Sequence, residues 1–463
     1  MVRGSQPFAE RSMHALLATL VLAAAPPLVK FERYTLPNGL TVILAQDRRL
    51  PVVGVQLWYH VGAANEAPGR SGFAHLFEHL MFQGSKHRQG NEQDLFGLLQ
   101  ANGVSDLNAS TSNDRTNYFE TLPANRLELA LWLESERMAF LLDGLDQTKL
   151  DNQRDVVRNE RRQTTENTPY GKAEVRLVEL MFPKPHPYYG YVIGSHEDLQ
   201  AATLDDVKAF FRTYYVPNNA SLVVTGDFDP TQTRALIEKY FGPIPRGAPV
   251  PPVTAVTQPI LSQQRDTLTD EVQLTRLFVG AIGPAAWSDD GFAFDIAQEI
   301  LAGGKTGRLY RALVFDRNLA QDVDMALEKS TLGSAAEIRI TLKPGHLPAE
   351  AEAVLDAELA RLARTPPSKE EMQRAQRSLE TRLYRAVERL NGNGSRAELL
   401  SAFEMWKGDP GFVNELVGRW RAVKPEEVSA KVRAVFAPAS RVVITVNPAT
   451  PPAPAAPAAA ANR

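Results

Sequence analysis

Two histidines and a glutamate stand close together in the chain as His75, Glu78 and His79. If this stretch is helical, residues four apart project from one face, so the two imidazoles can converge on one metal ion. The glutamate lies beside the second histidine, where it can activate a water at the metal without being a ligand. The alternative is a helix with two hydrogen-bonded histidines and no metal, because so short a pattern also occurs by chance.

A catalytic zinc takes about three protein ligands and keeps one position open, so a third ligand must come from elsewhere. The sequence has no cysteine, which leaves only nitrogen and oxygen as ligand atoms. The charged segment 151–166 has a helical pattern and contains Glu160 and Glu166. From pattern alone these two cannot be separated from Glu174 and Glu179, and such a segment is also typical of a solvated helix face.

The pattern around His75 and His79 lies on a predicted helix that follows three predicted strands. Segment 31–47 reads as two strands joined by a Pro-Asn-Gly turn, and 52–61 as a third strand rich in β-branched and aromatic residues. From Gly72 onward, apolar residues recur at helical spacing, and the helix should end near Gly84.

The chain contains an internal repeat with an offset of about 220 residues. Gly-Phe-Ala opens a helix at 72–74 and again at 291–293, and an aromatic-X-Pro sequence precedes a strand at 215–217 and at 436–438. Alignment of the copies places Phe294 opposite His75 and Gln298 opposite His79, so the second copy lacks the metal-binding pattern.

A chain of 463 residues is too long for one ordinary core. We therefore expect an α+β protein of two tandem homologous α/β domains, each an antiparallel sheet packed against helices. The N-terminal domain should span 30–242 and the C-terminal domain 260–448, joined by a Pro-rich linker at 243–259. We expect a disordered Pro/Ala tail at 449–463.

Residues 1–25 resemble a secretory signal, with Arg3 and Arg11 followed by an apolar run and three alanines. This predicts a periplasmic or secreted protein; the alternatives are a buried N-terminal helix or a translation start placed too early. The apolar run is too short to be a stable membrane span. A formal net charge of −3 predicts no attraction to nucleic acid.

Six segments together resemble the pitrilysin/insulinase family of inverted-motif zinc peptidases, which includes the mitochondrial processing peptidases. They are LPNGLTVIL, GFAHLFEHLMFQGS, NASTSNDRTNYFETLP, RDVVRNERRQ, HPYYGYVIGS and YYVPNNASLVVTGDFDP. The resemblance covers nearly all of 31–448. It implies one zinc ion per chain with Glu160 as the third ligand, Glu78 as the catalytic base, and Asn108 and Ala109 beside the bound substrate. It also implies that the two domains form half of a clamshell-shaped chamber.

The sequence departs from the family pattern in two places. Many relatives carry a second glutamate on the helix of the third ligand, where this chain has Gln153. Active single-chain relatives use an arginine and a tyrosine from the second half, where this chain has Val314 and Gln321. Nearby Arg308 and Tyr310 belong to the preceding helix.

The resemblance therefore implies a zinc metalloendopeptidase that cleaves small unfolded peptides and needs a zinc-free homologous subunit as partner. The alternatives are a homodimeric processing peptidase and a non-catalytic scaffold subunit.

Overall fold

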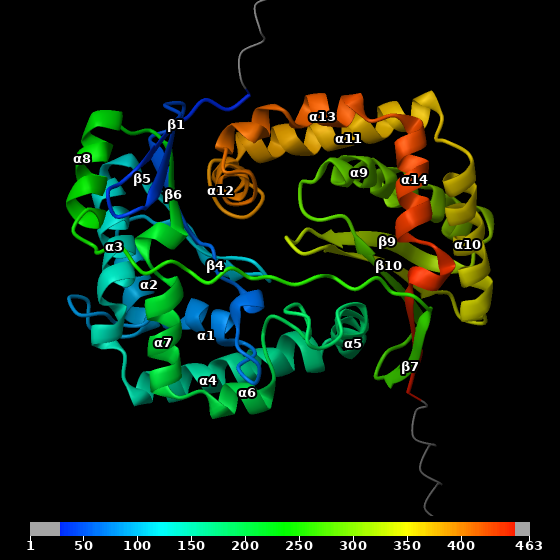
Figure 1. Ribbon diagram of the computed structural model, residues 1–463, viewed down its shortest axis with the longest axis horizontal. Helices are drawn as coiled ribbons and strands as arrows, with labels where there is room; N and C mark the ends of the chain where they lie inside the picture. The colour runs from blue at the N-terminus through cyan, green and yellow to red at the C-terminus, as the bar shows by residue number, and fades with distance from the viewer. Residues whose placement is uncertain (1–27, 450–463) are drawn as a thin grey trace, which may run out of the picture.

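The computed structural model of the protein describes residues 28–449. The predicted signal at 1–25 and nearly all of the predicted tail lie outside this range. Two β-sheets, each covered by helices, lie side by side and are joined by an extended segment between α8 and β7 (Figure 1).

The first sheet has six strands in the order β1-β2-β6-β3-β5-β4. Its strands are β1 (Glu32–Thr35), β2 (Thr41–Gln46), β3 (Val52–Tyr59), β4 (Ser105–Thr111), β5 (Thr116–Pro123) and β6 (Ala220–Gly226). Its helices are α1 (Phe73–Leu80), α2 (Glu92–Ala101), α3 (Leu127–Gly144), α4 (Gln147–Arg161), α5 (Gly171–Met181), α6 (His196–Ala201), α7 (Leu204–Tyr214) and α8 (Pro230–Phe241). Strand β4 pairs only with β5, so it forms one edge of the sheet.

The second sheet has five strands in the order β7-β11-β8-β10-β9. Its strands are β7 (Gln264–Asp270), β8 (Arg276–Gly283), β9 (Ala320–Glu328), β10 (Ser334–Leu342) and β11 (Val442–Pro448). Its helices are α9 (Asp289–Ala302), α10 (Pro348–Arg364), α11 (Lys369–Glu388), α12 (Arg396–Lys407), α13 (Leu416–Ala422) and α14 (Pro425–Val435).

The second sheet repeats the strand order of the first, with β7, β11, β8, β10 and β9 in the places of β2, β6, β3, β5 and β4. This confirms the predicted α+β fold with two copies of one arrangement. Each sheet is mixed, however, because β2 pairs with β6 and β7 with β11 in parallel. The prediction of purely antiparallel sheets was wrong in this detail, because each copy returns its last strand to the sheet after a long helical connection.

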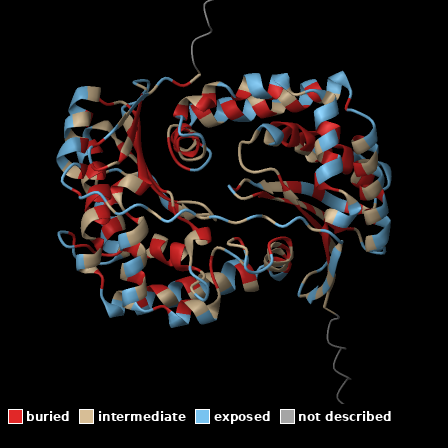
Figure 2. Ribbon diagram, viewed as in Figure 1, coloured by how far each residue is buried: buried red, intermediate tan, exposed pale blue. Residues whose placement is uncertain are grey.

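Each half has its own apolar core, and each lends a helix to the other half. Figure 2 shows the buried residues concentrated in the sheets and on the inner faces of the helices. Helix α5 packs on β8 and β11 of the second sheet, while α12 packs on β6 and β3 of the first. Gly280 permits the close approach of α5, since an added Cβ would lie 2.8 Å from Met181 Sδ. Gly54 permits the close approach of the segment between α11 and α12, since an added Cβ would lie 2.5 Å from Asn391 Cβ.

Within residues 28–449, no helix has both the length and the apolar character needed to cross a membrane.

Candidate metal centre

Helix α1 presents its polar residues on one face because its apolar residues occupy the other. Phe73, Leu76, Phe77 and Leu80 are buried, and the Phe77 ring lies 5.5 Å from that of Phe210 and 5.0 Å from that of Tyr215. This packing fixes the helix against α7 and leaves His75, Glu78 and His79 on the opposite face.

The first turn of α1 is held by a buried carboxylate. Glu66 accepts hydrogen bonds from the backbone nitrogens of Gly72 (2.9 Å) and Ala74 (2.8 Å). Burial raises the pKa of Glu66 to about 8 in spite of these bonds. Gly72 adopts a left-handed conformation (φ +87°), which glycine accommodates without strain.

Glu160 on α4 meets both histidines of α1. Its Oε1 lies 3.7 Å from His75 Nε2, and its Oε2 lies 3.1 Å from His79 Nε2. One ligand atom from each of the three residues falls within 4.8 Å of the other two. Among the described residues, this is the one such group of three or more histidine and acidic side chains.

The three side chains differ in how their surroundings shift their protonation. Burial and the neighbouring His79 lower the pKa of His75 to about 4. Burial also opposes protonation of His79, but the hydrogen bond and negative charge of Glu160 raise its pKa overall. The hydrogen bond from His79 lowers the pKa of Glu160. The contact between His79 and Glu160 therefore favours an ionised Glu160. His75 favours its neutral form, in which a ring nitrogen has the lone pair that a metal ligand needs.

These residues fit a zinc ion by chemistry and by spacing. Zinc binds histidine nitrogen and carboxylate oxygen at about 2.0–2.2 Å in tetrahedral geometry, which separates neighbouring ligand atoms by about 3.4 Å. The two His–Glu160 distances lie on either side of that value. Two imidazoles and one carboxylate also leave one coordination position open for a water or substrate.

Glu78 lies on the same face of α1 and is held by a residue of β4. Thr111 Oγ1 donates a hydrogen bond to Glu78 Oε2 at 2.6 Å. Burial raises the pKa of Glu78, although the Thr111 hydrogen bond acts in the opposite direction.

A cavity of about 240 Å³ joins these side chains to the edge strand β4. Its apolar wall is formed by Phe82, Phe96 and Leu107, and Glu92 also lines it. Asn108 reaches the same cavity and is exposed, whereas Ala109 is buried on β4. The side-chain oxygen of Asn108 accepts a hydrogen bond from the backbone nitrogen of Ala109 (2.8 Å).

The structure separates Glu160 from the other glutamates that the sequence pattern could not exclude. Glu166 pairs with Arg161 and His196, Glu179 with Arg176, and Glu174 with Arg339. Gln153 is buried on α4, and its side-chain oxygen has no hydrogen-bond partner among the described residues.

The corresponding place in the second half holds no metal-ligand set within the described range. Phe294 is buried in the core, and Gln298 donates a hydrogen bond to the backbone oxygen of Met325 (2.9 Å). Arg308 forms two hydrogen bonds with Glu371, at 2.7 and 2.8 Å, and Tyr310 packs against the core. Arg308 and Tyr310 are therefore occupied within their own half.

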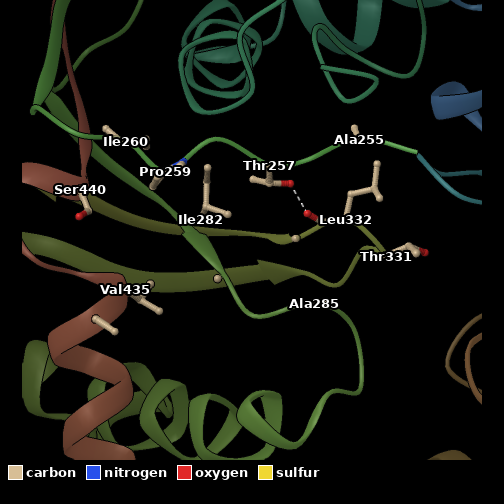
Figure 3. A pocket seen from close by; sticks show the side chains of 13 residues that line it. Ala255, Thr257, Pro259, Ile260, Ile282, Ala285, Thr331, Leu332, Val435 and Ser440 are labelled. Atoms are coloured by element: carbon tan, nitrogen blue, oxygen red, sulfur yellow. Dashed lines mark hydrogen bonds between the residues drawn. The ribbon is translucent and has the colours of Figure 1, made fainter. Parts of the chain in front are cut away.

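A cavity of about 520 Å³ lies between the interdomain segment and the second sheet (Figure 3). Thr257 crosses it with a hydrogen bond to the backbone oxygen of Leu332. None of its lining residues is titratable, so this cavity has no evident chemistry of its own.

Sequence reasoning missed Thr111, Glu66 and the apolar wall of the smaller cavity. Thr111 stands two residues after Ala109, so it lies on the same face of β4, and this alternation could have indicated it. No local pattern indicates Glu66, because its partners are backbone nitrogens.

Two family models match successive parts of the chain. "Insulinase (Peptidase family M16)" matches residues 41–181, which include His75, His79 and Glu160. "Peptidase M16 inactive domain" matches residues 201–379, where no comparable cluster lies within the described residues.

Curated relatives carry consistent names. The zinc protease PqqE of Helicobacter pylori is 34% identical over 311 residues, covering 66% of this chain and 69% of that protein. The mitochondrial-processing peptidase subunit beta of Neurospora crassa is 25% identical over 284 residues, covering 59% of this chain and 57% of that protein.

Solved structures share the fold. A Helicobacter pylori protease superposes with a TM-score of 0.84 at 26% identity, covering 91% of this chain and all of that one. The first half of the periplasmic protease PqqL from Escherichia coli gives a TM-score of 0.74 at 19% identity, covering 92% of this chain and 93% of that one.

Proposed function

Because the chain belongs to the insulinase family of peptidases (family M16), we propose that it is a zinc-dependent endopeptidase subunit that hydrolyses small unfolded peptides. The observation that carries this proposal is the convergence of His75, His79 and Glu160 beside the buried carboxylate of Glu78. A non-catalytic scaffold has no use for a base placed next to a complete set of ligands.

We propose that His75, His79 and Glu160 hold one zinc ion per chain. When bound, zinc would supply a Lewis acid that polarises the scissile carbonyl and lowers the pKa of water toward about 7. Glu78 accepts the proton of the attacking water and later donates it to the leaving amine, a role that contributes roughly 100- to 10,000-fold. Burial suits Glu78 to both steps, because it raises the pKa of the carboxyl group.

The edge strand β4 provides the substrate-binding surface in this proposal. An extended peptide can add to an unpaired strand edge through backbone hydrogen bonds. Asn108 and Ala109 lie on that edge strand, and Asn108 lines the cavity that also holds His75, His79 and Glu160. Peptides must be unfolded to bind in this manner, because a folded protein offers few free backbone groups.

We assign the catalytic role to a domain at 30–242 and a homologous, inactive role to 260–448, with 243–259 as linker. In the second half, Val314 packs against the core and Gln321 stands at the start of β9. Neither can act as the arginine and tyrosine of active single-chain relatives. We therefore propose that a zinc-free homologous subunit supplies these contacts, and that the chain is exported to the periplasm or secreted.

Zinc content and peptide cleavage of the purified chain test this proposal. We expect about one zinc per chain and no cleavage of a quenched oligopeptide by the isolated chain. A homologous chain that co-purifies with it, expressed separately and added back, should restore cleavage.

Cleavage by the isolated chain as a dimer would favour the homodimeric peptidase. A chain that binds no zinc would contradict the catalytic assignment and favour the alternative of a non-catalytic scaffold subunit.

A further inference from the structure

We propose that Thr111 is a positioning residue for Glu78, and that the second half of the chain holds Thr111 in place through the β4–β5 hairpin. This inference rests on the proposed function, since it concerns the orientation of the proposed base. It assigns a supporting role in catalysis to the half that has no metal-ligand set among its described residues.

The contact between Thr111 and Glu78 is short and directed. At 2.6 Å, the O–H···O distance is in the range of a hydrogen bond to an ionised carboxylate. Within residues 28–449, no other side chain donates a hydrogen bond to Glu78. The bond engages Oε2 and leaves Oε1 for the proton of the attacking water.

The turn that follows Thr111 is held by the second half, directly through Thr331 and indirectly through Tyr188 of the first half. Asp114 accepts a hydrogen bond from Tyr188 through Oδ1 (2.7 Å) and from the backbone nitrogen of Thr331 through Oδ2 (2.8 Å). The Tyr188 hydroxyl in turn accepts from the backbone nitrogen of Leu332 (2.9 Å). Thr331 and Leu332 lie in the turn between β9 and β10, so the corresponding hairpin turns of the two halves meet here.

Ser110, the residue before Thr111, is linked through side-chain contacts to the same junction, that is, the place where the β4–β5 and β9–β10 turns meet. Arg115 donates to the backbone oxygen of Ser110 (2.7 Å) and to its hydroxyl (2.6 Å). The guanidinium of Arg115 lies over the ring of Trp58 at 5.1 Å, and that ring makes an edge contact at 6.1 Å with Trp406 of α12. Trp406 also donates to the hydroxyl of Thr331 (3.0 Å).

Thr111 therefore stands between two residues whose positions depend on contacts with the second half. A change at the junction can move the Thr111 hydroxyl without touching the metal ligands. Small displacements of a catalytic group are costly because proton transfer needs hydrogen-bond distance and alignment.

The first test compares Thr111→Val with Thr111→Ser in the assembled, zinc-loaded enzyme. Valine keeps the shape but removes the hydroxyl, and serine keeps the hydroxyl. We expect valine to lower kcat about tenfold or more, with KM changed less than about twofold, and serine to restore most of kcat. Zinc content should be unchanged in both variants.

The second test is a double-mutant cycle with Asp114→Asn, which replaces one acceptor oxygen by a donor and so breaks one arm of the clamp. We expect a several-fold loss of kcat with zinc retained, and no further loss when Asp114→Asn is combined with Thr111→Val. Asp289→Asn, at an aspartate whose side chain is 92% exposed, serves as the matched control.

A Thr111→Val enzyme with wild-type kcat would overturn the role of Thr111, as would loss of zinc in proportion to activity. Independent, multiplying losses in the double variant would overturn the link through the hairpin. These outcomes differ from failure of the proposed function, in which the zinc-loaded wild-type enzyme itself cleaves no peptide.

Discussion

His79 Nε2 lies 3.1 Å from Glu160 Oε2, across the contact between α1 and α4. The two residues are far apart in the sequence, and only the packing of these helices brings a nitrogen and a carboxylate oxygen to the spacing of neighbouring zinc ligands. The position of α4 against α1 is therefore as important to the proposed metal centre as the histidine pattern itself.

Glu160→Gln should abolish stoichiometric zinc binding, because the amide carries no negative charge and is a poor zinc ligand. Glu166→Gln is the matched control, since Glu166 ends the short π-helix that follows α4 (Arg162–Glu166) but pairs with Arg161 and His196. Zinc content after gel filtration distinguishes them. Loss of zinc in the Glu166 variant, with zinc kept in the Glu160 variant, would refute the ligand assignment.

Zinc should also stabilise the folded chain. A ligand that binds only the folded state at about 100 times its Kd adds about 2.7 kcal/mol to the free energy of unfolding. We expect a chelator to lower the Tm of the wild-type chain and added zinc to restore it. The Tm of Glu160→Gln should not respond to either treatment; an equal response in both proteins would place the stabilising metal elsewhere.

The ion pair of Arg308 and Glu371 should make stability depend on pH in the acid range. Hydrogen bonds from Arg308 lower the pKa of Glu371 from 4.5 to about 2, so the folded state favours the ionised carboxylate. Its stabilising contribution is complete above pH 4.5 and is lost as the pH falls toward 2. Because Glu371 is partly solvated, we expect this contribution to be on the order of 1 kcal/mol.

Urea unfolding of Glu371→Gln and wild type at pH 7, 5, 4 and 3.5 measures this effect. The difference in unfolding free energy should be largest at pH 7 and should shrink below pH 4.5. Glu426→Gln, at an exposed position in the first turn of α14, is the control and should change the unfolding free energy less than Glu371→Gln does at pH 7. A difference for Glu371→Gln that stays constant down to pH 3.5 would show that the ion pair with Arg308 does not lower the pKa of Glu371 in the folded state.

Gly54→Ala should weaken the junction between the halves. An added Cβ would lie 2.5 Å from Cβ of Asn391, whose amide donates to the backbone oxygens of Val55 and Glu120. Overpacking of this kind costs about 1–3 kcal/mol. Gly97→Ala on α2 has no atom within 4 Å of its new Cβ and should be neutral or stabilising. Chemical denaturation measures the free energy of unfolding of both variants. Equal values for the two would refute a tight contact between Gly54 and Asn391.

The sequence predicted those parts of the site that depend on local periodicity. His75, Glu78 and His79 share a helix face because the apolar residues of α1 define the other face. Asn108 and Ala109 were placed beside the bound substrate by resemblance alone. Glu160 was identified as the third ligand by resemblance alone, because the sequence around it gives no reason to prefer it to Glu166. Only tertiary packing distinguishes the two, since it places Glu160 beside His79 and Glu166 beside Arg161.

Features that depend on distant partners could not be predicted. Helix α1 was expected to end near Gly84 but ends at Leu80. Arg88 donates hydrogen bonds to the backbone oxygens of Phe82 and Gln83, so these groups are satisfied without a continued helix. The Thr111 hydrogen bond to Glu78 and the clamp on Asp114 likewise join residues that no sequence spacing connects.

The most direct test of the central claim compares Glu78→Gln with the wild-type chain, each zinc-loaded and assembled with the partner if one is needed. We predict about one zinc per chain in both proteins and cleavage of a quenched oligopeptide lowered at least about 100-fold in the variant. Glu128→Gln, at an exposed position on α3, should cleave as the wild type does. Wild-type rates in Glu78→Gln, or the absence of zinc from the wild-type chain, would contradict the account.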